Sequence, residues 1–116
     1  MRHKKGFTKL SKATDQRLAM LYSIVRSLLK YGKVKVTEAR GKEARKIAEG
    51  IIELAKRGDL SSRRRAASII SDSDIVKRVF TEAKTRFGQR TGGYTRLVKI
   101  GSRHGDAAPM VLLELV

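Results

Sequence analysis

The residues of this chain best suited to acid–base chemistry are His104 and Asp106, which stand two positions apart near the carboxyl end. A histidine in hydrogen-bond contact with a carboxylate can act as a general base. The chain has no cysteine and no recognisable serine-nucleophile motif, so no nucleophile accompanies the pair. A polar loop that contacts RNA explains the same two residues better, and we expect no enzymatic activity.

Motifs for metal ions and nucleotide phosphates are incomplete. Asp72-Ser73-Asp74 resembles the start of a calcium loop, but the glycine and the terminal glutamate of such a loop are missing, so we expect a helix N-cap instead. Gly41-Lys42 lacks the preceding glycine and the Ser/Thr of a P-loop and falls within a helical pattern. The acidic residues are scattered, and without cysteine no thiolate zinc site can form. We therefore expect no metal and no cofactor.

Basic side chains dominate the remaining chemistry. Lysine and arginine number 27 against 11 aspartate and glutamate residues, for a formal net charge of +16. Self-repulsion of this size favours a polyanionic partner, and each phosphate that is neutralised releases counterions, which makes binding sensitive to salt. Charge alone admits nucleic acid, an acidic protein or a membrane surface. No run approaches the ~18 apolar residues of a membrane span, and we expect nucleic acid.

The first 13 residues form a basic segment with five lysines and arginines, one histidine and no acid. Phe7 and Leu10 are its only large apolar groups, so it cannot form a core. We predict an arm over residues 1–13 that becomes ordered on RNA, the alternative being a solvated terminus. Its candidate contacts are Arg2, His3, Lys4, Lys5, Lys9 and Lys12.

The segment 90–96 combines two adjacent glycines with flanking arginines and a tyrosine. Glycine lets backbone N–H groups approach an anion, arginine offers forked donors to phosphate, and a tyrosine ring can stack on a base. An ordinary turn that opens a strand explains the same residues equally well. The candidates are Arg90, Gly92, Gly93, Tyr94 and Arg96. Arg103 and His104 add a second basic tip in a later loop.

Arg63, Arg64 and Arg65 are consecutive and fall in a predicted helix. Helical neighbours lie ~100° apart, so the three side chains span about 200° and cannot all face one row of phosphates. We expect two of them to contact RNA while the third lies along the protein surface, although a solvated helix face would also fit. Arg17, which lies off the apolar stripe of the first predicted helix, is a further candidate.

The elements that must position these groups follow from the hydrophobic pattern. Apolar residues at 3–4 spacing predict a helix from Thr14 to a C′ glycine at Gly32, and strict alternation predicts a strand over 33–37. Thr37 can cap a second helix that reaches about Arg57, with Arg45–Glu49 and Glu53–Arg57 as possible i,i+4 ion pairs. Further helices are predicted from the Asp59 cap to Ile70 and from Ser73 to Phe87, and strands over 94–100 and 110–116 with a loop over 101–109.

This order of elements predicts one α+β domain over residues 14–116 behind the arm. The helices over 59–70 and 73–87, joined by a short turn, also admit a helix-turn-helix that reads DNA. Two amphipathic helices that pack on one core explain the same residues, and we favour this second interpretation.

Five short motifs are spread along the whole chain: Met1-Arg2-His3, Arg17-x-Ala19-Met20, Gly92-Gly93-Tyr94-Thr95-Arg96, Gly105-Asp106-x-Ala108-Pro109-Met110 and Glu114-Leu115-Val116. In these motifs the chain resembles, from end to end, the bacterial large-subunit ribosomal protein L-seventeen family. The resemblance implies a two-layer α/β fold ordered α-β-α-α-α-β-β, with a small sheet packed on helices.

For function, the resemblance implies a structural constituent of the large ribosomal subunit that supports subunit assembly and translation. The expected partners are large-subunit ribosomal RNA and neighbouring ribosomal proteins, with no membrane and no small-molecule substrate. The expected location is the cytoplasm, bound to ribosomes. A DNA-compacting or regulatory protein is the alternative that the charge and the possible helix-turn-helix leave open.

Overall fold

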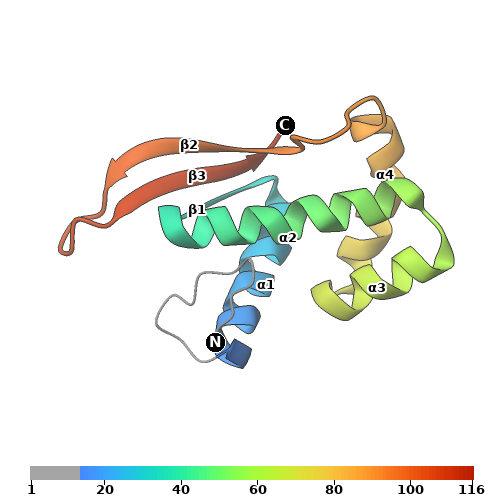
Figure 1. Ribbon diagram of the computed structural model, residues 1–116, viewed down its shortest axis with the longest axis horizontal. Helices are drawn as coiled ribbons and strands as arrows, with labels where there is room; N and C mark the ends of the chain where they lie inside the picture. The colour runs from blue at the N-terminus through green and yellow to red at the C-terminus, as the bar shows by residue number, and fades with distance from the viewer. Residues whose placement is uncertain (1–13) are drawn as a thin grey trace, which may run out of the picture.

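The computed structural model describes residues 14–116 and contains four helices and one three-stranded antiparallel sheet (Figure 1). The elements are α1 (Thr14–Tyr31), β1 (Lys33–Thr37), α2 (Glu38–Arg57), α3 (Leu60–Ile70), α4 (Ser73–Phe87), β2 (Thr95–Ser102) and β3 (Pro109–Leu115). The predicted α+β class and the order α-β-α-α-α-β-β are confirmed. The predicted arm over residues 1–13 lies outside the described residues.

The sheet has the strand order β1-β3-β2, so the last strand of the chain lies in the centre. Both neighbours run antiparallel to β3, and Glu114 pairs with Lys33 on one side and with Arg96 on the other. A bulge between Lys99 and Gly101 interrupts the register of β2, yet pairing continues beyond it to Pro109. The predicted loop over 101–109 is therefore too long, because the bulge lets the ladder extend and leaves only residues 103–108 between the strands.

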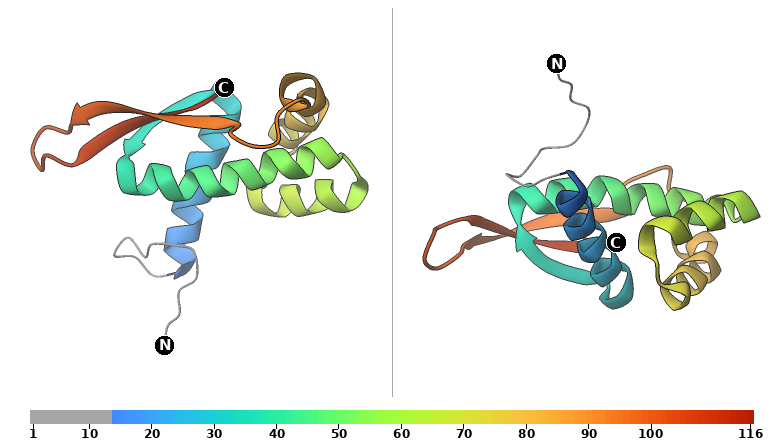
Figure 2. Two further views of the ribbon diagram at one scale, coloured as in Figure 1. Left: turned by 45° about the horizontal axis from the view of Figure 1, so that its top comes forward. Right: turned by 90° about the horizontal axis from the view of Figure 1, so that it is seen from below.

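The helices α1 and α2 cover one face of the sheet, which gives two layers, and α3 and α4 pack against these two helices (Figure 2). Side chains alternate along β3: Val111 and Leu113 are fully buried beneath the helices, whereas Met110 and Leu112 on the other face are half-buried. Apolar residues of α1, α2, α3 and α4 join Leu113 in one core. The helices α3 and α4 contribute Ala66 and Val76 to that core, as expected for amphipathic helices that pack on it.

The helix α2 crosses the sheet at Gly41, where backbone and strands approach closely. A Cβ atom at this position would lie 2.9 Å from Val111 Cγ2, 3.2 Å from Leu97 Cδ2 and 3.2 Å from Val36 Cγ2. These three side chains belong to β3, β2 and β1, so one residue without a side chain lets the helix rest on all three strands. Gly41 is therefore a packing residue of the helix and not part of a phosphate-binding loop.

The predicted helix boundaries are confirmed by local hydrogen bonds and backbone angles. The Asp59 carboxylate accepts a hydrogen bond from Ser62 N at 2.8 Å. Hydrogen bonding to the side chain of Ser62, followed by this backbone bond, lowers the pKa of Asp59. Asp72 caps α4 in the same manner, and Gly58 closes α2 in the left-handed conformation with φ of 73°. Thr37 occupies the N-cap position of α2, but its side chain makes no cap hydrogen bond.

The ion pairs that we predicted along α2 are wrong. Within the described chain the helix pairs Lys42 with Glu38 at 3.4 Å and Lys46 with Glu43 at 2.9 Å. The carboxylates of Glu49 and Glu53 instead turn towards the start of β2 and accept hydrogen bonds there. Glu49 therefore contacts Thr95, and Glu53 contacts Tyr94, in place of the arginines on their own helix.

Candidate nucleic-acid interface

The acidic side chains of the described residues are mostly used in hydrogen bonds within the protein. All 11 acids of the sequence lie after residue 13, and nine of them take part in caps, ion pairs or contacts with β2 and β3. These nine are Asp15, Glu38, Glu43, Glu49, Glu53, Asp59, Asp72, Asp106 and Glu114. Four of them pair with a lysine or arginine, so the positive surface follows from the excess of 27 cations over 11 acids in the sequence, which suits a polyanion.

The loop before β2 presents its two glycines to open space. A Cβ atom at Gly92 or at Gly93 would meet nothing within 4 Å, and Gly93 has a φ of 65°. Arg90 Nη1 donates a hydrogen bond to Gly93 O at 3.2 Å, so the arginine closes the turn that it flanks. Arg96, at the far end of the segment, forms an ion pair with Glu114 at 2.7 Å while staying mostly exposed.

Tyr94 corrects one prediction about this segment. Its side chain is 0% exposed, and its ring packs edge-on against Phe87 with centroids 5.4 Å apart. A ring without exposed surface cannot stack on a base, so the expected stacking face is wrong for this conformation. The sequence pattern placed an aromatic beside arginines, but the ring belongs to a small core with Ile52.

Three side chains of α2 fasten the loop and the start of β2 to the helix. The Tyr94 hydroxyl donates to Glu53 Oε2 at 2.6 Å and accepts from Lys56 Nζ at 2.8 Å. Lys56 also donates to Arg90 O, and Glu49 Oε2 accepts from both the backbone N and the hydroxyl of Thr95, at 2.9 and 2.8 Å. The sequence analysis missed these contacts, which join residues more than 30 positions apart. These hydrogen bonds hold the loop that contains Gly92 and Gly93 against α2.

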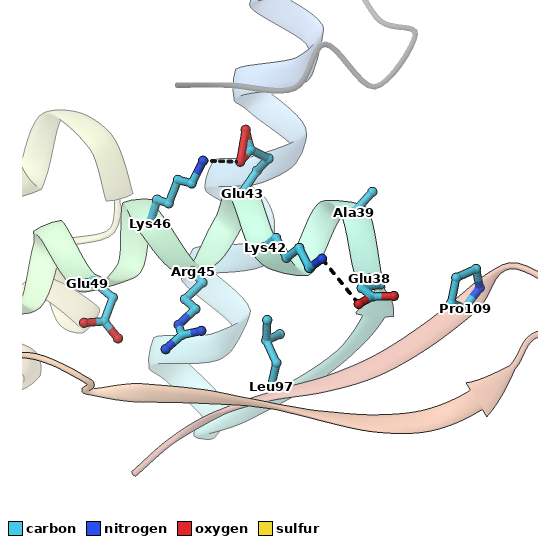
Figure 3. A pocket seen from close by; sticks show the side chains of 9 residues that line it. All are labelled: Glu38, Ala39, Lys42, Glu43, Arg45, Lys46, Glu49, Leu97 and Pro109. Carbon is cyan, nitrogen blue, oxygen red and sulfur yellow. Dashed lines mark ion pairs between the residues drawn. The ribbon is translucent and has the colours of Figure 1, made fainter. Parts of the chain in front are cut away.

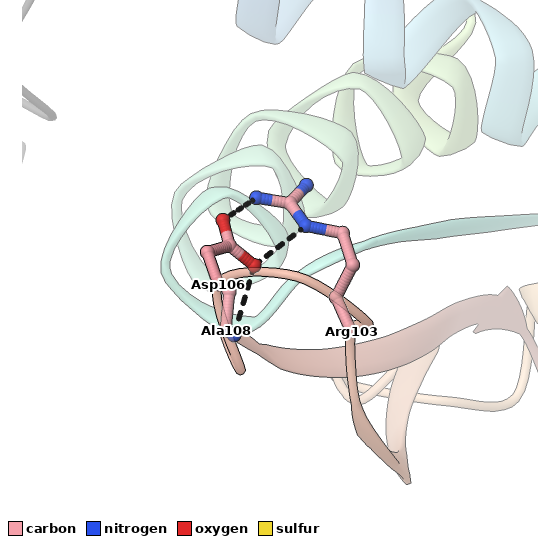
Figure 4. Close-up of polar contacts among 3 residues, drawn as sticks. All are labelled: Arg103, Asp106 and Ala108. Carbon is pink, nitrogen blue, oxygen red and sulfur yellow. Dashed lines mark hydrogen bonds and ion pairs between the residues drawn. The ribbon is translucent and has the colours of Figure 1, made fainter.

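The tip of the β2–β3 hairpin is held by a forked ion pair (Figure 4). Arg103 donates to both carboxylate oxygens of Asp106, at 3.1 and 2.5 Å, and Ala108 N donates to the same carboxylate at 3.2 Å. The Arg103 hydrogen bond, followed by that of Ala108, lowers the pKa of Asp106 to about 2, and Asp106 in turn raises the pKa of Arg103. Asp106 is thus engaged by Arg103, while His104 is exposed beside it.

The three arginines of α3 are all exposed. The guanidinium of Arg63 lies over the Phe80 ring, 5.9 Å from its centroid, which fits the expectation that one of the three follows the protein surface. Arg64 and Arg65 remain as candidates for phosphate contacts. Arg17 differs from them, because it is only 8% exposed and offers an RNA phosphate little surface in this structure.

The basic hairpin tip lies far from the other two basic regions of the described surface. The hairpin tip projects from one end, α3 lies at the opposite end, and the loop between α4 and β2 lies beside the far end of α2 (Figure 1). The longest dimension is 43 Å, so the fold distributes its cations instead of gathering them in one site. Such a spread suits several contacts along a folded polyanion better than one small ligand.

An open groove of about 1080 Å³ lies between α2 and the hairpin (Figure 3). Its rim carries both signs of charge, including the Lys42–Glu38 and Lys46–Glu43 ion pairs, and Leu97 and Pro109 contribute apolar surface. No group of three or more metal-ligating side chains occurs within residues 14–116. None of the helices in that range combines the length and apolar character needed to cross a membrane.

Comparison with known proteins assigns the family. A model of the family described as "Ribosomal protein L17" matches residues 20–116. The large ribosomal subunit protein bL17 of Desulforapulum autotrophicum is 49% identical over 116 residues, which cover 100% of this chain and 97% of that protein. The chain belongs to the ribosomal protein L17 family.

Other members show the same likeness. The bL17 protein of Clostridium botulinum is 51% identical over 111 residues, which cover 96% of this chain and 98% of that protein. The bL17 protein of Desulfosudis oleivorans is also 51% identical over all 116 residues, which make up 56% of its longer chain. The resemblance carried by the sequence motifs is thereby confirmed.

Proposed function

We propose that this protein is a structural constituent of the large ribosomal subunit that binds large-subunit ribosomal RNA and has no catalytic role. The observation that carries the proposal is the arrangement of charge: most acids already have hydrogen-bond partners within the protein, while the more numerous cations occupy separate exposed regions. RNA phosphates would be neutralised at several places on a body 43 Å long. The name shared by its relatives, large ribosomal subunit protein, supports the same assignment.

The proposed contacts are those that the fold leaves accessible. They comprise the basic residues at three positions on the described surface, together with the arm whose residues lie outside it. The set is Arg64 and Arg65 on α3, Arg90, Gly92 and Gly93 before β2, Arg96, Arg103 and His104 on the hairpin, and Arg2, His3, Lys4, Lys5, Lys9 and Lys12. Neighbouring ribosomal proteins would complete the environment.

Co-sedimentation tests the function. A tagged copy of the full chain, expressed in a bacterial cell, should travel with large subunits through a sucrose gradient and stay bound after a moderate salt wash. Recovery of the protein only in ribosome-free fractions would contradict the proposal. Competition at fixed salt separates the alternative function, since duplex DNA should displace ribosomal RNA only if the protein is a DNA-binding one.

The contribution of α3 can be measured through the salt dependence of RNA binding. Replacing Arg64 and Arg65 by glutamine should reduce the slope of log K against log[salt] by roughly 1 to 2, which corresponds to about 0.7–0.9 for each lost phosphate contact. Replacing Lys42 and Lys46 by glutamine is the matched control, because it removes the same amount of charge from ammonium groups that pair with Glu38 at 3.4 Å and Glu43 at 2.9 Å. An equal slope in all three proteins would remove α3 from the interface.

A further inference from the structure

Tyr31, the last residue of α1, exposes an aromatic ring that the family assignment does not explain. Its side chain is 68% exposed, whereas every other tyrosine and phenylalanine of residues 14–116 is buried or half-buried. Leaving a ring of this size in water forgoes the free energy of its burial. The ring is therefore available to contact a partner.

The backbone that carries Tyr31 is fastened from both sides. Gly32, with a φ of 86°, donates its N–H to Leu28 O at 2.7 Å and closes the helix. Arg78 of α4 donates to Leu29 O and, at 2.9 Å, to Lys30 O. Leu115 N donates to Gly32 O at 2.9 Å, so the end of β3 also holds this turn (Figure 2). The ring therefore stands on a rigid base, and ordering it for binding costs little conformational entropy.

A lysine lies over the Tyr31 ring, and two arginines line the hollow beside it. The Lys30 ammonium lies 5.3 Å from the Tyr31 ring centroid. Tyr31 also borders a hollow of about 230 Å³ whose lining includes Arg78 and Arg86. Arg86 Nε additionally donates to Val116 O at 3.3 Å. An aromatic face with flanking cations is the combination by which proteins hold single-stranded nucleic acid.

Two features favour an RNA base over a protein side chain as the occupant. The apolar residues that line this hollow, such as Val79 and Phe87, are mostly buried, and the other large exposed apolar residues of 14–116, Leu60, Val98 and Ile100, lie outside it. The ring therefore has little exposed apolar surface beside it, unlike a protein-binding hot spot. Glu82 lies in the same lining. Its carboxylate can accept a hydrogen bond from an exocyclic amino group of a base that enters the hollow.

We propose that Tyr31 is a stacking platform for an unpaired RNA base and that Lys30 and Arg78 contact the phosphates beside that base. This inference rests on the proposed RNA-binding function and adds a base-contacting residue to it. Phosphate contacts alone would bind a strand equally well with or without its bases. A ring that stacks requires a single-stranded or bulged nucleotide, so the platform selects unpaired RNA.

The test measures binding of the full chain to two probes of equal length: a short oligoadenylate and the same ribose-phosphate strand without bases. Tyr31→Leu keeps an apolar side chain but removes the ring, and Tyr31→Phe keeps the ring. We expect Tyr31→Leu to weaken oligoadenylate binding by roughly ten-fold, in the range of a lost base stack, and to leave the base-free strand unaffected. Tyr31→Phe should bind both probes as the unmodified protein does. Circular dichroism verifies that each variant is folded.

Fluorescence supplies a second measurement, because the chain has three tyrosines and no tryptophan. Stacking should quench part of the tyrosine emission when oligoadenylate is added, and Tyr31→Leu should lose that part. Equal binding of oligoadenylate by Tyr31→Leu and the unmodified chain would overturn the inference, as would a parallel loss for both probes. Either result would leave co-sedimentation with large subunits unchanged. Failure of the unmodified chain to co-sediment would instead count against the proposed function.

Discussion

Gly41 and Gly50 of α2 permit a sharp test of how closely the helix rests on the sheet. Both glycines lie inside the same helix, but a Cβ atom at Gly50 would meet nothing within 4 Å, whereas one at Gly41 would lie 2.9 Å from Val111 Cγ2. Gly50→Ala and Gly41→Ala therefore share the same change in helix propensity. They differ in whether the new methyl group has room.

The expected magnitudes follow from two opposing contributions. Alanine stabilises a helix interior by about 0.5–1 kcal/mol relative to glycine, so Gly50→Ala should raise the free energy of unfolding by that amount. At Gly41 the same gain is opposed by overpacking, which costs about 1–3 kcal/mol in a well-packed core. The methyl group of Val111 is on a stiff β-branched side chain in the central strand, so it cannot move aside cheaply. Gly41→Ala should therefore destabilise the fold by about 1 kcal/mol net.

Urea unfolding followed by circular dichroism at 222 nm, a wavelength typical for helix content, measures both variants against the unmodified protein. The free energies of unfolding of the two variants should differ by about 2 kcal/mol, with Gly50→Ala above and Gly41→Ala below the unmodified protein, and the m values should be equal. Val111→Ala removes the nearest methyl group, so in that background Gly41→Ala should cost less, as a double-mutant cycle will show. Equal stabilisation by Gly41→Ala and Gly50→Ala would refute the close approach of α2 to the strands.

Three further predictions concern the interface. Tyr94→Phe removes a hydroxyl bonded to Glu53 and Lys56, and it should lower the free energy of unfolding by about 1 kcal/mol, since the exposed Glu53 regains water; no change in chemical denaturation would contradict this. The Asp106 pKa is lowered to about 2 from 3.8, so the ion pair with Arg103 should persist above pH 4 and be lost as the pH falls through 2. In an NMR titration Arg103→Ala should return the midpoint towards 3.8, and identical midpoints would argue against the pair. Deleting residues 2–12 should weaken RNA binding and flatten its salt dependence while the circular dichroism of the core is retained, and an unchanged slope would exclude the arm from the contacts.

Much of the secondary structure was predictable because its determinants are local. Asp59 and Asp72 accept hydrogen bonds from residues two or three positions away, and Gly58 adopts the left-handed conformation directly after its helix. Such contacts form wherever the chain turns helical, so their signals can be read from a short window. The hairpin loop was predicted too long because the bulge at Gly101 depends on pairing with β3.

The interface was less predictable, since residue types do not reveal exposure. Tyr94 stands two residues before Arg96 and Tyr31 directly follows Lys30, yet the first is 0% exposed and the second is 68% exposed. Which ring is buried depends on Phe87 and Ile52, which come from two other helices. Glu49 likewise finds its partner 46 positions away, at Thr95, and no short sequence window contains that pair.

The sequence by itself determined the charge, the family, the order of elements and the absence of a complete catalytic motif, because composition, periodicity and caps are properties of neighbouring residues. The strand order β1-β3-β2 and the sharing of acids between helix and strand were decided only by the tertiary structure. The tertiary structure also decided that the Tyr94 ring is buried and the Tyr31 ring is exposed. Each of these depends on surfaces far apart in the chain being buried against one another, and burial is a property of the packed whole.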